Sequence, residues 1–91
     1  FNSVKNSSKP VLLDFYADWC GPCQMVSPVV DEIAAENPQY LIGKINVDNE
    51  SELARTFKVF SIPTLVVLKN GEITSRSVGA KSKSDILAML T

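Results

Sequence analysis

The 91-residue sequence contains no histidine and only two cysteines. Without histidine, the chain has no imidazole for acid–base catalysis near neutral pH and lacks a common zinc ligand. Two cysteines are too few for the disulfide network that stabilises many small secreted domains. The net charge is −1 and the basic residues do not cluster, so the sequence gives little support to nucleic-acid binding.

Long apolar runs are also absent. The longest, such as residues 64–68, are far shorter than the roughly 20 residues that a membrane-spanning helix needs. The composition is 45% hydrophobic and 21% charged, which is typical of one globular domain over residues 1–91. No signal peptide is visible. That absence says little about the compartment. We expect a cytoplasmic protein, with a periplasmic or secreted location as the alternative if a signal preceded Phe1.

The hydrophobic pattern predicts an α/β fold. We expect strands at residues 11–17, 40–47, 65–68 and 72–78, and helices at 20–37, 50–58 and after residue 82. The first strand is almost entirely apolar, as in sheets that helices cover on both faces. A helical connection between the first two strands implies a parallel pair, and Asn70-Gly71 predicts an antiparallel hairpin. The central sheet should therefore be mixed.

Two local signals refine the helices. Pro28 lies inside the helical pattern and should kink the first long helix. Ser82, with Asp85 three residues later, predicts the N-cap of the last helix. Residues 1–10, with apolar side chains only at Phe1 and Val4 before Pro10, could form the end of a short helix that leads into a loop.

Cys20 and Cys23 form a C-x-x-C pair at a predicted strand-to-helix junction. A zinc site would need ligands from a second subunit, and closing so short a loop would stabilise the fold by only about 2 kcal/mol. A redox role has more support, because a helix N-terminus favours the thiolate. Pro22 suits the first helical turn, and Gly21 should permit the close approach of the two cysteines. We expect an exposed, attacking Cys20 and a resolving Cys23 one turn inside.

Several motifs together resemble the thioredoxin family. They are Trp19-Cys20-Gly21-Pro22-Cys23, with Asp14-Phe15 before it and Pro28 after it, then Lys44, Ile62-Pro63-Thr64, Asn70-Gly71-Glu72 and Val78-Gly79-Ala80. The resemblance covers almost the whole chain. It implies a thioredoxin-like three-layer fold, with a mixed central sheet flanked by helices and without the family's N-terminal edge strand. Such a sheet would leave the strand at residues 40–47 exposed and prone to self-association.

The resemblance also implies a protein-disulfide reductase. In this thiol–disulfide oxidoreductase, Cys20 forms a mixed disulfide with the substrate and Cys23 releases the reduced product. No bound cofactor is needed, because the redox-active Cys20–Cys23 disulfide carries the electrons. The implied partners are proteins that contain disulfides and a separate NADPH-dependent flavoprotein reductase. A non-enzymatic scaffold, or a truncated or engineered variant with impaired activity, is the alternative.

Cys23 needs a base, and Asp14 is the candidate. A carboxylate in an apolar strand is costly to bury, so its pKa should rise toward neutral pH. The alternative is an aspartate held by a structural hydrogen bond, and the resemblance favours the role in proton transfer. Lys44 either lies near Asp14 and tunes it or is a solvated surface lysine.

The remaining candidates would bind substrate. Trp19 could be a core residue, but its place before Cys20 favours an apolar docking surface. That surface would be formed by Trp19, Gly21, Pro22, Ile62 and Gly79. By resemblance, Pro63 is a cis-proline facing the cysteines, so that Ile62 offers its backbone to an extended substrate.

Overall fold

A computed structural model describes residues 8–91 of the chain. The elements are β1 (Val11–Tyr16), α2 (Gly21–Glu36), β2 (Leu41–Asn46), α3 (Ser51–Thr56), β3 (Thr64–Lys69), β4 (Glu72–Val78) and α4 (Lys83–Leu90). Their order and type confirm the prediction, and most bounds differ by only one or two residues. The helix end expected near Phe1 and Val4 lies outside the described residues.

The four strands form one mixed sheet in the order β2-β1-β3-β4. β1 pairs in parallel with β2 and antiparallel with β3, while β3 and β4 form an antiparallel hairpin. Asn70 and Gly71 both have positive φ angles, of 54° and 82°. That combination is typical of the tight turns that match the twist of paired strands. The expected mixed sheet is therefore confirmed.

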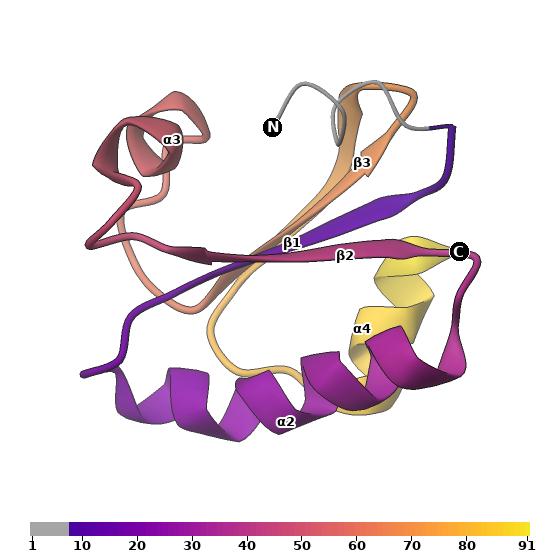
Figure 1. Ribbon diagram of the computed structural model, residues 1–91, viewed down its shortest axis with the longest axis horizontal. Coiled ribbons are helices and arrows are strands. Elements are labelled where there is room, and N and C mark those ends of the chain that lie inside the picture. Colours follow the sequence, from indigo (N-terminus) through magenta and orange to yellow (C-terminus); the bar gives the residue numbers. More distant parts are fainter. Residues whose placement is uncertain (1–7) are drawn as a thin grey trace.

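Helices cover both faces of the sheet, as Figure 1 shows, with α2 and α4 on one face and α3 on the other. Side chains of β1 alternate between the two layers. Leu13 and Phe15 pack in a cluster that includes Phe57, while Leu12 packs in a second cluster with Val30 and Ile86. All of these residues are buried. The three-layer arrangement is therefore confirmed, and β1 contributes to both cores.

The helix ends follow the local sequence signals. Ser82 is the N-cap of α4, and its side chain accepts a hydrogen bond from the backbone N–H of Asp85 at 3.2 Å. α2 continues through Pro28 to Glu36 as one helix. The predicted N-cap at Ser82 is confirmed, whereas a kink at Pro28 stays a prediction.

β2 is an edge of the sheet within residues 8–91. In this part of the chain it pairs with β1 alone, through the register from Val11–Leu41 to Tyr16–Asn46. The other edge is β4, whose residues are mostly exposed. The unpaired N–H and C=O groups of an edge strand can pair with another chain. Self-association through the β2 edge stays a prediction.

Candidate active site

The two cysteines form a disulfide at the start of α2. Cys20 is the N-cap, with extended backbone (φ −86°, ψ 113°), and its Sγ accepts a hydrogen bond from the backbone N–H of Cys23 at 3.2 Å. The two Cα atoms are 5.3 Å apart. In the reduced form, the same N–H groups and the helix dipole would stabilise a thiolate on Cys20. This geometry supports the redox interpretation of the pair.

Neither cysteine is exposed in this disulfide form. Cys20 has a relative exposure of 4% and Cys23 of 3%. The expectation of an exposed Cys20 is therefore wrong. The physical reason is packing, since both cysteines form a small cluster with Ala17, against which Val47 and Ile62 pack from other segments. Access to the sulfur atoms is thus controlled by the residues around them.

Gly21 has open space around it at the start of α2. A Cβ atom there would meet nothing within 4 Å outside its two chain neighbours and the helix backbone, and the role of Gly21 in the approach of the two cysteines stays a prediction. Pro22 does lie in the first turn of α2, as predicted, where its missing N–H leaves no helical bond unmade. Gly21 and Pro22 are both exposed. They add neither a charge nor a long side chain to the surface beside the disulfide.

Two distant segments meet the disulfide at this end of the sheet. The Sγ of Cys20 lies 3.8 Å from the carbonyl oxygen of Ile62. The peptide bond between Ile62 and Pro63 is cis. The N–H of Gly79, whose φ is +97°, donates to the carbonyl of Pro63 at 2.8 Å. The fold therefore gathers predicted site residues from three parts of the chain, and their contacts with a substrate stay a prediction.

Trp19 is exposed, so the alternative of a core tryptophan is wrong. Its indole Nε1–H donates to Oδ2 of Asp48 at 2.9 Å, across 29 positions of sequence. This bond orients the ring beside the disulfide. Asp48 was not predicted as a site residue, because nothing local in the sequence links it to Trp19.

Asp14 is buried in the middle of β1, with a relative exposure of 1%. Desolvation raises its pKa from the ordinary 3.8 to about 6, while the charge of Lys44 lowers the pKa and that of Asp31 raises it. Within residues 8–91, its Oδ1 atom has no hydrogen-bond partner. A carboxyl group in this state can exchange a proton near neutral pH.

Lys44 lies next to Asp14 in the β1–β2 register. Its ammonium group, however, bonds to Oδ1 of Asp31 at 2.6 Å and to Oγ of Ser27 at 2.6 Å, both on α2. Lys44 is thus an exposed lysine that is paired with α2, and its charge also lowers the pKa of Asp14. The sequence reasoning missed Asp31 and Ser27, although helical spacing from Cys23 places both on α2.

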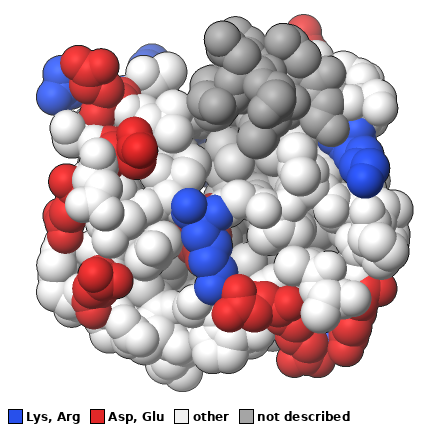
Figure 2. Space-filling view, viewed as in Figure 1, with Lys and Arg blue, Asp and Glu red and all other residues white. Residues whose placement is uncertain are grey.

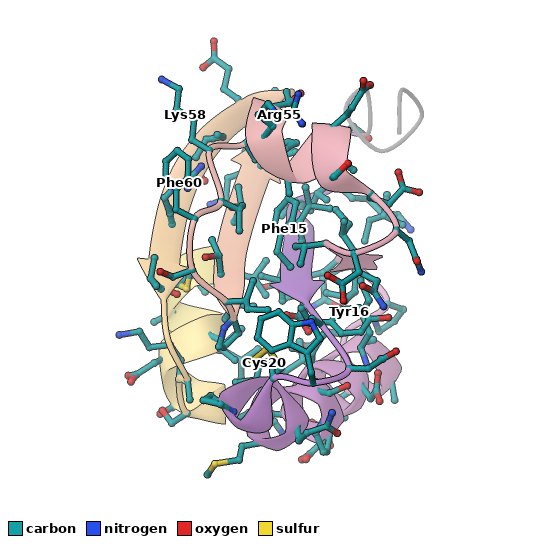
Figure 3. The ribbon with its side chains drawn as sticks, turned by 90° about the vertical axis from the view of Figure 1, so that its left-hand side faces the viewer. Phe15, Tyr16, Cys20, Arg55, Lys58 and Phe60 are labelled. Carbon is teal, nitrogen blue, oxygen red and sulfur yellow. A yellow bond between two sulfur atoms is a disulfide. The ribbon has the colours of Figure 1, made fainter. Side chains whose placement is uncertain are left out.

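A shallow groove of about 180 Å³ lies beside Trp19 and Ile62. It is lined by Trp19, Val47, Val59, Phe60, Ser61 and Ile62. Figure 3 shows Phe60 on the segment between α3 and β3, above Cys20 in that view. A larger hollow of about 530 Å³ lies beside β2 and α3, and none of the predicted substrate-binding residues lines it. Phe60 was not predicted as a site residue.

Other kinds of site find no support in the part of the chain that the structure describes. No group of three or more metal-ligating side chains occurs there. None of its helices combines the length and the apolar character needed to cross a membrane. On the face in Figure 2, basic side chains lie apart from one another among uncharged and acidic ones. This face offers no basic patch for a polyanion.

Known proteins resemble this chain in sequence and fold. The family model described as Thioredoxin matches residues 1–91. The thioredoxin of Mycobacterium bovis is 52% identical over 89 residues, which cover 97% of this chain and 77% of the relative. The bifunctional thioredoxin reductase/thioredoxin of Mycobacterium leprae is 49% identical over 92 residues, which cover 100% of this chain and 20% of the relative.

A solved structure agrees with these matches. A mutant thioredoxin from Halobacterium salinarum NRC-1 superposes with a TM-score of 0.89 at 40% identity, covering 97% of this chain and 77% of that one. This chain thus spans about three quarters of two relatives and a fifth of the bifunctional one. The chain belongs to the thioredoxin family and is a thiol–disulfide oxidoreductase that works through Cys20 and Cys23.

Proposed function

We propose that the chain acts as a single-domain protein-disulfide reductase in which Cys20 attacks and Cys23 resolves. The Cys20 thiolate attacks one sulfur of a substrate disulfide, forms a mixed disulfide and displaces the other substrate sulfur as a thiolate. Cys23 then attacks Sγ of Cys20 and displaces the second substrate sulfur. The substrate gains two electrons and two protons, and the chain is left as the disulfide. The observation that carries this assignment is the Cys23 N–H that donates to Sγ of Cys20.

We propose Asp14 as the group that accepts the proton of Cys23 in the second step. Three properties support this role: burial in β1, a pKa raised to about 6, and an Oδ1 atom without a hydrogen-bond partner among residues 8–91. At pH 7 most of the carboxyl is ionised and can take up a proton. Lys44 limits the rise in that pKa, because its positive charge favours the carboxylate.

The substrate would dock on the uncharged surface around the disulfide. In this proposal Trp19, Gly21, Pro22, Ile62 and Gly79 contact the substrate, and Pro63 holds the Ile62 carbonyl beside Cys20. An extended segment can bond to such a backbone group and contribute little side-chain selectivity of its own. The distance of 3.8 Å between Sγ of Cys20 and the Ile62 oxygen supports this arrangement.

The oxidised pair must be reduced again after each turnover. We propose that a separate NADPH-dependent flavoprotein reductase does this, and that the chain works in the cytoplasm. The printed name of the Mycobacterium leprae relative, which joins a thioredoxin reductase to a thioredoxin, supports such a partner. Proteins with accessible disulfides would be the substrates.

Reduction of insulin disulfides with dithiothreitol as the electron source tests the proposed function. The wild type should accelerate the reaction, and Cys20→Ser should lower the rate to the background of dithiothreitol alone. Ser84→Ala, at an exposed position on α4, is the control and should react like the wild type. A Cys20→Ser variant as fast as the wild type would instead favour a non-enzymatic scaffold.

A further inference from the structure

Phe60 is the most exposed large apolar side chain among the described residues, at 88%. An aromatic ring of this size normally contributes to a core, where its burial would stabilise the fold. Neighbouring Val59 is partly buried and Phe57 is buried, so the segment does have inward positions. The exposure of Phe60 therefore has no evident role in folding.

The position of Phe60 connects it to the active site. Phe60 precedes Ile62 by two residues, and both line the groove that Trp19 and Val47 also border. Ile62 in turn packs against the cluster of Cys20 and Cys23. Neither cysteine lines the groove, but Ile62 belongs to the groove and also packs against the disulfide.

The groove also has a definite chemistry. None of its six lining residues carries a charge, and five of them are apolar. An apolar cavity of about 150 Å³ can hold a benzene molecule, so 180 Å³ has room for one aromatic or branched aliphatic side chain. An acidic side chain would lose hydration there and find no cationic partner among the six lining residues.

We propose that Phe60 is a specificity-determining residue, which with Trp19 forms a subsite for one large apolar side chain next to the cysteine of the substrate. The proposal rests on the disulfide reductase function above and names the substrates that this reductase prefers. Polypeptides with leucine or phenylalanine beside the disulfide cysteine should react faster than those with serine or aspartate there. The subsite acts before any bond changes, so it should affect KM more than kcat.

Two synthetic peptides with the same intramolecular disulfide, one with leucine and one with serine next to a cysteine, test this proposal. The wild type should show a kcat/KM about tenfold higher for the leucine peptide, within the range for one apolar side chain in a pocket. Phe60→Ala should reduce this ratio to less than about threefold, and Phe60→Leu should restore most of it. Met25→Ala is the matched control. Met25 is another exposed apolar residue, at 72%, but it does not line the groove.

Each outcome has a distinct meaning. If the wild type reduced neither peptide, the proposed function would fail and the subsite with it. If it reduced both peptides equally well, or if Phe60→Ala kept the wild-type ratio, the reductase would stand and the subsite would be refuted. A wild type that sediments as a dimer, and that Phe60→Ala converts to a monomer, would assign the groove to a second copy and overturn the proposal.

Discussion

The interior beneath the disulfide and the surface around it have opposite chemistry. The interior holds a carboxyl group, Asp14, in a strand whose other residues are apolar. The surface holds the exposed aromatic rings of Trp19 and Phe60. Each arrangement reverses the usual distribution of polar and apolar groups, and each has a cost in stability. One end of the fold thus departs from the usual burial rules twice, and we propose that the first departure serves proton transfer and the second serves binding.

Removing the buried carboxyl should have the larger effect on the reaction. Asp14→Asn should slow the resolving step at pH 7 by about 100-fold, the lower range for loss of a general base. Mixed disulfides between Cys20 and the substrate should accumulate, and non-reducing electrophoresis after rapid acid quenching would measure them. Asp18→Asn, which removes an exposed carboxylate two residues before Cys20, is the control. Normal resolution by Asp14→Asn would refute the proposed role of Asp14.

The same carboxyl should make stability depend on pH. Because the folded pKa is about 6 and the ordinary one 3.8, the folded state binds this proton more tightly than the unfolded state. Asp14 therefore contributes stability at pH 4 that is lost as the pH rises through 6. Two pKa units at about 1.4 kcal/mol each give about 3 kcal/mol.

Urea unfolding of the oxidised protein measures this effect. The free energy of unfolding of Asp14→Asn, relative to the wild type, should increase by about 2.4 kcal/mol between pH 4 and pH 8, because part of the unfolded carboxyl is still protonated at pH 4. Asp18→Asn, at an exposed position near the active site, is measured in parallel as the control. A difference between Asp14→Asn and wild type that stays constant with pH would show that Asp14 titrates normally.

A smaller effect is expected on the aromatic surface. Asp48→Ala removes the acceptor of the Trp19 indole and should lower kcat/KM for protein disulfides by about fivefold, as for one net hydrogen bond. The fluorescence anisotropy of Trp19, the single tryptophan of the chain, should fall as the ring becomes mobile. Asp48→Asn keeps an acceptor oxygen and should behave closer to the wild type. Unchanged anisotropy in Asp48→Ala would mean that other contacts fix the ring.

The sequence was sufficient for the parts of the molecule that local rules decide. Asn70-Gly71, the Ser82 cap and the apolar strand from Val11 each carry a short-range signal, and the structure follows them. The buried position of Asp14 could also be predicted, since its neighbours in β1 are all apolar.

Contacts between distant segments could not be predicted in the same way. The pairing of Trp19 with Asp48 and that of Lys44 with Asp31 depend on how loops and helices are placed in space. The burial of Cys20 depends on Ile62, which lies 42 positions away. Phe60 gave no signal at all, because an isolated aromatic residue in a sequence usually indicates a core position.

Strand β1 lies between the two hydrophobic clusters, and its even-numbered and odd-numbered residues face different clusters. Leu13 and Phe15 face α3, whereas Leu12 faces α2 and α4. By the same alternation Asp14 lies on the α2 side, where the sulfur atoms are. Inserting a single residue between Val11 and Asp14 would rotate the carboxyl to the opposite layer and direct a bulky side chain toward the cysteines. The layer in which Asp14 lies thus depends on whether its position in this six-residue strand is even or odd. An insertion of one residue before Asp14 would change that layer, and an insertion of two residues would not.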